Sequence, residues 1–328
     1  GRKGDWRGFI TEHLTDLRRS KDDANVVADQ LIPSMVYAAD SGYGHPLEGT
    51  EDAVDSFTRE DIKGHFEENY APSWATLIVV GDVTADQVQQ NAEATFAGWS
   101  ANGRALKPNA KNPDTKTGET TIFLVDRPGS AQSVIRTVHG MVPRSHPDYF
   151  GLTLLNYAFG GQFSARLNQN LRQDKGYSYG YNSSIHWYRG PSMLTAGGSV
   201  QTEVTKEAVI ETLKEFQEVR DSRPITAEEL DGAKAGLLLG YPASFERPGL
   251  VLNHLLQLVL FDLPDDYFQE MPARLSGVNL SEVHRMTSEH IQTDALQIIV
   301  VGDRETIEPG LNELGIPLVH LAADGSRL

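Results

Sequence analysis

The sequence predicts an α+β fold built from two homologous units, each a mostly antiparallel sheet with helices packed on one face. The first observation behind this prediction is a segment that occurs twice, as ATLIVVGD at residues 75–82 and as ALQIIVVGD at residues 295–303. When the two copies are aligned on their Gly-Asp pairs, Gly302 of the second corresponds to Gly81 of the first. A repeat with so long a period indicates a duplicated domain and not a solenoid of short units.

The second observation is the order of the predicted elements. Neighbouring strands pair as hairpins and helices come in runs, which is typical of α+β folds, whereas a doubly wound sheet needs strict alternation of strands and helices. A helix follows each Gly-Asp pair, but no Gly-rich phosphate loop follows either strand. The pattern therefore does not support a nucleotide site.

The first hundred residues are expected to be mainly helical. Residues 5–21 form an amphipathic pattern that places Trp6, Phe9, Ile10, Leu14 and Leu17 on one side of a helix. A loop rich in Gly, His and Pro follows the second predicted helix, at residues 41–50. The predicted elements of this part are helices at 5–21, 23–38, 58–69 and 84–97 and a strand at 75–80.

A polar segment separates the two units. Residues 101–118 contain Pro, Gly, Asn and Lys and almost no apolar side chain, which is the composition of a linker. The predicted domains are therefore the C-terminal part of a first unit at 1–100 and a complete second unit at 119–328. The second unit has predicted strands at 120–126, 133–140, 176–188, 192–200, 296–301 and 317–321, and predicted helices at 147–159, 163–172, 203–219, 226–240, 246–261, 281–290 and 304–314.

The first unit is expected to lack its front. The second copy of the repeated segment has a whole unit ahead of it, beginning near Gly118, whereas the stretch of chain that leads up to Gly81 of the first copy is much shorter. The comparison of the two copies places roughly a hundred residues of the first unit before Gly1.

Composition excludes several functions. The net charge is −16, from 45 acidic and 29 basic residues, and the chain has no basic stripe of the kind that phosphate contacts require. There are no cysteines, which excludes disulfides, thiolate metal sites and cysteine nucleophiles. No apolar run reaches the ~18 residues that a membrane span needs.

The histidines do not form a zinc motif. None of the ten lies four residues from another, so neither H-E-x-x-H nor H-x-x-E-H occurs. His284 and His290 flank an acidic helix, but their spacing of six residues puts them on different faces, where we expect solvated side chains. No G-x-S-x-G elbow supports a serine hydrolase.

The stretch from 159 to 184 is the richest in functional side chains. Arg172 closes a predicted helix, a turn at residues 174–176 follows, and Tyr177, Tyr179 and Tyr181 alternate along the next strand, which puts all three phenols on one face. An Arg at a helix end and a Tyr on the adjoining strand could together donate to a carbonyl or carboxylate. On pattern alone, Arg172 could equally balance the helix dipole while the tyrosines pack on the sheet.

Three features together resemble the insulinase/pitrilysin-type zinc metallopeptidases and the related mitochondrial processing peptidases. They are the duplicated unit, the segment from Tyr70 to Asp82 that ends Ile-Val-Val-Gly-Asp, and the pair of motifs FGGQFSARL (159–167) and LRQDKGYSY (171–179). The loop Gly44-His45-Pro46 and the pair Gly49-Thr50 also match the family. The resemblance covers essentially the whole chain.

The resemblance implies a zinc enzyme in which an H-x-x-E-H motif and a later Glu hold the metal, and the motif's own Glu is the general base. It also implies that a later domain supplies an Arg and a Tyr seven residues apart that bind the peptide substrate. Arg172 and Tyr179 have that spacing, with Gly176 in the turn between them. We therefore expect Arg172 and Tyr179 to orient the peptide backbone near the scissile carbonyl.

The chain also departs from the family pattern. The H-x-x-E-H segment would fall in the missing front, and the position expected for the third zinc ligand, a Glu, is near Asp16. The helix predicted at 147–159 has neither His nor Glu. We therefore expect a non-catalytic component with no catalytic or metal-binding residue of its own, and zinc supplied by a partner subunit or by the missing segment.

Two alternatives stay open at this stage. One is a structural subunit of a complex without peptidase activity, and the other is a fragment of a complete zinc endopeptidase whose H-x-x-E-H segment has been removed. The expected partners are a homologous H-x-x-E-H-bearing subunit, as in a heterodimer, and a peptide or unfolded protein. The relatives suggest a periplasmic location, which no residue of the chain itself indicates.

Overall fold

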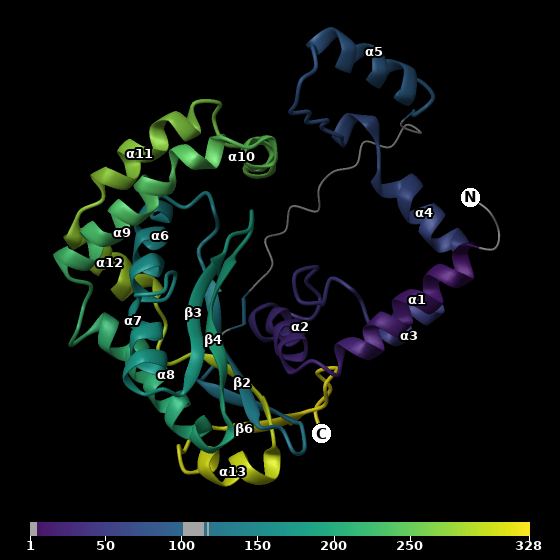
Figure 1. Cartoon of the computed structure of the whole chain (residues 1–328). Helices are drawn as coiled ribbons and strands as arrows, with labels where there is room; N and C mark the ends of the chain where they lie inside the picture. Colours follow the sequence, from purple (N-terminus) through teal and green to yellow (C-terminus); the bar gives the residue numbers. More distant parts are fainter. Residues whose placement is uncertain (1–4, 101–114, 117) are drawn as a thin grey trace.

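A computed structural model describes residues 5–100, 115–116 and 118–328 (Figure 1). The second unit is organised around one six-stranded sheet with the strand order β3-β4-β2-β5-β1-β6. Strand β2 is antiparallel to β4 and β5, and β3 is antiparallel to β4, whereas β1 is parallel to β5 and β6. The predicted α+β class is confirmed. The strands are β1 (Thr121–Asp126), β2 (Gln132–Met141), β3 (Ser178–His186), β4 (Ser192–Gln201), β5 (Gln297–Gly302) and β6 (Leu318–Leu321).

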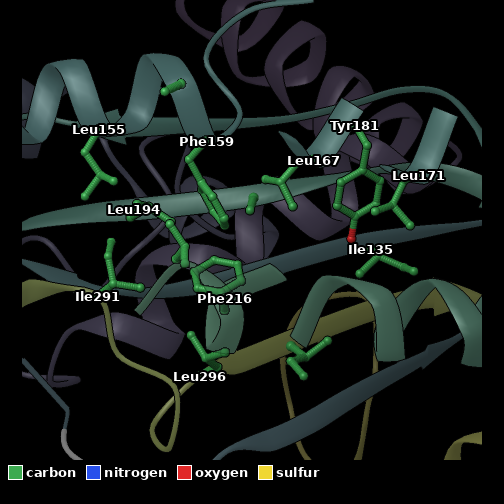
Figure 2. Close-up of a cluster of buried hydrophobic side chains, with 14 of the residues drawn as sticks. Ile135, Leu155, Phe159, Leu167, Leu171, Tyr181, Leu194, Phe216, Ile291 and Leu296 are labelled. Atoms are coloured by element: carbon green, nitrogen blue, oxygen red, sulfur yellow. The ribbon is translucent and has the colours of Figure 1, made fainter. Parts of the chain in front are cut away.

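A layer of helices covers one face of this sheet. Figure 2 shows the core between the helices and the sheet, where Phe159, Phe216 and Tyr181 contact side chains of the strands. Phe159 and Phe216 contact edge to face, with ring centroids 5.1 Å apart. The helices of the second unit are α6 (Tyr149–Phe159), α7 (Arg166–Asn168), α8 (Thr205–Arg220), α9 (Ala227–Gly240), α10 (Pro248–Phe261), α11 (Tyr267–Gly277), α12 (Leu280–His290) and α13 (Arg304–Asn312).

The opposite face of the sheet is covered by α2 (Ala24–Val36), which comes from the first unit (Figure 1). Along β5, Ile298 and Val300 pack into the helical layer, while Ile299 and Val301 pack with α2. This explains why the segment reads as an uninterrupted apolar run, since a strand buried on both faces has no polar side. We expected helices on one face of the sheet only. The structure has them on both faces, because α2 from the first unit covers the second face.

The end of α2 is fixed to the second unit by polar and aromatic contacts. The Tyr37 hydroxyl donates to the carbonyl of Pro191 at 2.8 Å, in the turn between β3 and β4. The Tyr37 ring also contacts Tyr43 and Tyr188. Burial raises the pKa of the Tyr37 phenol, so it remains a neutral donor.

The rest of the first unit is helical, but its predicted strand is absent. The helices are α1 (Asp5–Ser20), α3 (Glu51–Ser56), α4 (Arg59–Asn69) and α5 (Ala85–Phe96). The strand predicted at 75–80 is wrong: the segment forms no ladder, and Leu77 and Val79 are exposed. Strand β5 is held between β1 and β2, whereas no strand accompanies residues 75–80 within the described part of the first unit. A strand without neighbours leaves its backbone groups unpaired.

Two helices of the structure, α3 and α11, were not predicted from the sequence. The six residues of α3 are too few for a helical repeat to be recognised. Helix α11 contains Pro272, which reads as a helix breaker.

The predicted linker lies mostly outside the described residues. Within this linker, the backbone N–H of Lys116 donates to the carbonyl of Val36 at the end of α2. The domain boundaries remain predictions.

We predict that Ile32→Ala weakens the contact between α2 and the sheet. Ile32 is buried in this contact, and truncation of a buried Ile leaves a cavity that costs about 2–5 kcal/mol. Urea denaturation should show that loss in the free energy of unfolding. Ile62→Ala, on the exposed face of α4, is the matched control and should change it little. Equal effects of the two substitutions would contradict a packed α2.

Candidate substrate-binding site

A bulge in the edge strand β3 determines where Tyr179 points. Ser178 pairs with Val200 and Tyr181 pairs with Gly198, so β3 has one residue more than β4 over this stretch. An extra residue shifts the alternation of side chains. Tyr181 is therefore buried in the core of the helical layer, whereas Tyr179 is 88% exposed. The prediction that all three phenols share one face is wrong, because it assumed a regular strand.

Hydrogen bonds hold the bulge in place. The Tyr181 backbone N–H donates to Asn168 Oδ1 at 3.1 Å. The Ser178 hydroxyl donates to the carbonyl of Ser199 at 2.7 Å, and its oxygen accepts the backbone N–H of Gly180 at 3.1 Å. The exposed position of Tyr179 is therefore built into the backbone.

Tyr179 lines a surface hollow of about 510 Å³ on the face of the sheet that carries α2. Arg136 of β2 and Asn25 of α2 also line it. Arg136 Nε is 2.7 Å from Asp29 Oδ1, and its Nη2 donates to Asn25 Oδ1 at 3.1 Å. The hollow thus offers a phenol and amide groups beside a guanidinium that is already paired.

Arg172 lies in a π-helical turn, Gln169–Asp174, where the sequence predicted an α-helix over 163–172. Such turns are frequent at functional sites. The turn closes with the backbone N–H of Lys175 donating to Asn170, and Gly176 follows at φ 67°, a conformation that favours glycine. The Arg172 guanidinium lies 4.3 Å from the ring centroid of Phe163, so a cation–π contact orients it.

The two predicted site residues lie in neighbouring elements but have separate surroundings. Tyr179 lines the hollow, and Arg172 is not among its lining residues. Among the described residues, no hydrogen bond joins their side chains, and Arg172 makes no ion pair. Whether the two act on one substrate stays a prediction. Asp16, where the family's third zinc ligand is expected, is exposed on α1.

A cluster that the sequence analysis missed joins the start of α6 to the end of α12. His290 Nε2 is 2.7 Å from Asp148 Oδ2, and the rings of His146 and His290 are 5.3 Å apart. His290 is thus a partly buried partner of Asp148 and not the solvated side chain that we expected. The pair His146 and Asp148 did not indicate a cluster in the sequence, because the third residue, His290, is far away along the chain.

This cluster does not fit a zinc site, although its ligand atoms lie within 4.8 Å of one another. Arg285 donates to both carboxylate oxygens of Asp148, at 2.7 and 3.1 Å. A cation at this place would be repelled by the guanidinium and would compete for the same oxygens. The hydrogen bonds from Arg285 and then His290 lower the pKa of Asp148 to about 2. The cluster is an ion-pair network that ties two helices together.

Known proteins that resemble the chain in sequence are peptidases. A family model described as the peptidase M16 inactive domain matches residues 56–237, more than half of the chain. The uncharacterized zinc protease YmxG of Bacillus subtilis is 25% identical over 288 residues, which are 87% of this chain and 68% of YmxG. The probable mitochondrial-processing peptidase subunit beta of Schizosaccharomyces pombe is 22% identical over 88% of this chain and 65% of its own length.

Solved structures share the fold. The peptidase M16 inactive domain from Pseudomonas fluorescens has a TM-score of 0.80 at 19% identity, over 92% of this chain and 71% of that protein. A protease from Helicobacter pylori has a TM-score of 0.79 at 15% identity, over 92% and 73%.

The fold and the comparisons place the chain in the class of zinc-protease-like proteins. The chain belongs to the M16 peptidases and matches their inactive domain, which confirms the resemblance inferred from its motifs. It spans about two thirds of the length of the relatives that it matches. No described helix is long and apolar enough to cross a membrane.

We predict that Asp148→Asn destabilises the chain at neutral pH. The lowering of the Asp148 pKa from 3.8 to about 2 corresponds to about 2 kcal/mol. Because the folded pKa is depressed, this stabilisation is present above about pH 4 and is lost as the pH falls toward 2. Denaturation curves should therefore differ at pH 7 and converge near pH 2. The exposed Asp231→Asn is the control, and a pH-independent difference would contradict the network.

We predict that Gly198→Ala disrupts the bulge, whereas Gly180→Ala is tolerated. A Cβ on Gly198 would lie 2.3 Å from the carbonyl oxygen of Gly180, which is backbone and cannot move aside cheaply. The nearest atom to a Cβ on Gly180 is 3.9 Å away. Thermal unfolding should show a lower midpoint for Gly198→Ala alone. Equal midpoints for both variants would argue against a rigid bulge.

Proposed function

We propose that this chain is the non-zinc-binding component of an M16 peptidase, which binds and orients a peptide through Arg172 and Tyr179. A homologous subunit, as in a heterodimer, or another segment of the same protein would supply zinc and the general base. The observation that carries the proposal is the bulge in β3, which exposes the Tyr179 phenol at the position where the family motif has its Tyr. The match to the inactive domain supports it.

The chemistry of the two side chains suits a peptide carbonyl. A phenol donates one hydrogen bond, and a guanidinium donates several in a fixed plane. Arg172 is oriented by Phe163 and makes no ion pair within the described chain, so its donors are available to a ligand. Such donors stabilise the negative charge that develops on the carbonyl oxygen during hydrolysis. The zinc of the partner, when bound, activates the attacking water.

A structural role is the second candidate. One solved structure with the same fold is titled Complex III2 from Candida albicans, with a TM-score of 0.73 over 93% of this chain. A scaffold subunit would need the packing of the sheet but not the Arg172 and Tyr179 side chains.

The third candidate, a piece of a complete zinc endopeptidase, differs from the first in where the H-x-x-E-H motif is encoded. Zinc content of the full-length protein, measured with and without its partner, separates these candidates.

We predict that Arg172→Ala and Tyr179→Phe each lower kcat of the reconstituted peptidase, because each removes a donor to the developing oxyanion. Loss of one such donor typically costs about 10²–10³-fold in kcat. Arg172→Lys keeps the charge but loses the planar donor arrangement, so it should restore only part of the activity. Turnover of a fluorogenic peptide measures the effect.

Two surface substitutions are the matched controls. Arg59→Ala and Tyr70→Phe remove the same groups from exposed positions on and next to α4. We expect both to leave turnover unchanged. Full activity of Arg172→Ala and Tyr179→Phe, with zinc still bound by the partner, would leave the scaffold role as the better account.

A further inference from the structure

The hollow beside Tyr179 has almost no apolar wall. Apart from the Tyr179 ring, every residue that lines it is either polar or a glycine. An aliphatic group in this hollow would gain little contact with apolar surface, and it would cover polar groups without pairing them. The lining therefore favours a polar group of a ligand.

Gly197 of β4 opens the hollow. It pairs with Arg136 of β2 on one side and with Asn182 of β3 on the other. A Cβ on Gly197 would clash with the backbone carbonyl oxygen of Ile135, so this position has no room for a side chain. Arg136 and Asn182 are therefore separated by a gap in the row of side chains, and all three residues line the hollow.

The guanidinium at the hollow is already paired. Arg136 Nε lies 2.7 Å from Asp29 Oδ1, and Nη1 donates to the carbonyl of Ile135 at 3.2 Å. Its Nη2 donates to Asn25 Oδ1 at 3.1 Å. An acidic ligand group would be repelled by Asp29 and a basic one by Arg136, so the pair favours a neutral ligand group.

The amide side chains at the hollow have unused hydrogen-bonding groups. Within the part of the chain that the structure describes, the side chains of Gln132 and Asn182 make no hydrogen bond. Asn25 accepts from Arg136 through its Oδ1, which leaves its Nδ2 as a donor. A carboxamide has both a donor and an acceptor, so the free groups match a ligand that also has both.

We propose that this hollow is a subsite for an Asn or Gln side chain of the peptide substrate. The inference rests on the proposed function, because Tyr179 then places the hollow next to the scissile carbonyl. The substrate carboxamide exchanges hydrogen bonds with Gln132 and Asn182. A leucine in its place leaves these amides covered and unpaired, which is how a hydrogen-bonding site rejects an analogue without the matching group. Gln132 and Asn182 are then specificity-determining residues.

Peptides that differ only by Asn or Leu test the subsite, because the two side chains have nearly the same shape. The full-length protein, together with its zinc-bearing partner, is given fluorogenic peptides that carry Asn or Leu at each position flanking the scissile bond in turn. At one position we expect kcat/KM to be about tenfold higher for Asn, which corresponds to about two neutral hydrogen bonds.

Substitutions in the hollow should remove this preference. Asn182→Leu should cleave the Asn and Leu peptides equally well, and Gln132→Met, on another strand, should weaken the same preference. Asn312→Leu is the matched control at an exposed position at the end of α13, and it should keep the preference. Absence of an Asn preference at every position would overturn the subsite. So would an equal loss for both peptides in Asn182→Leu, because the amide would then bind the peptide main chain.

A binding measurement separates this inference from the proposed function. With zinc removed by a chelator, the fluorescence anisotropy of labelled peptides gives the Asn preference as a ratio of Kd values without turnover. If Arg172→Ala and Tyr179→Phe keep full turnover while this ratio depends on Asn182, the proposed orientation of the peptide fails and the subsite is supported. If those two variants lose turnover and no ratio differs from one, the subsite alone is overturned.

Discussion

Burial of the central strand β5 on both faces and along both edges is the constraint on which the rest of the structure depends. Its backbone is satisfied by β1 on one side and β2 on the other. Its side chains alternate between the helical layer and α2. A strand of this kind has no polar face to leave in water, so the fold needs a helix on the second face. That helix comes from the other unit, which makes the two units interdependent.

The same segment behaves differently where its surroundings are absent. Residues 75–80 have nearly the same sequence as β5, but they form no ladder in the described chain and expose Leu77 and Val79. Intrinsic strand propensity is weak compared with pairing and burial. Helix α2 is buried against the sheet of the second unit, whereas no residue of α10 is buried within the described chain.

The candidate substrate-binding site depends on irregularities at the edge of the sheet. The edge strand β3 contains a bulge, and the π-helical turn with Arg172 leads into it. Asn168 connects the two, because its side-chain oxygen accepts the backbone N–H of Tyr181 within the bulged stretch. Such irregularities reorient single side chains without disturbing the core. Tyr181 fills the core while Tyr179, two residues earlier, points to the surface hollow.

The sequence by itself determined the α+β class, the duplication, the boundaries of most helices and the location of the Arg172 and Tyr179 motif. These depend on local signals: caps, apolar periodicity and a repeated segment. Only the tertiary structure decided that residues 75–80 form no strand, that Tyr179 and Tyr181 point to different faces, and that His146, Asp148 and His290 meet. Each of these depends on partners that are distant in the sequence. A local pattern cannot contain them, because pairing, bulges and ion-pair networks are properties of contacts between elements.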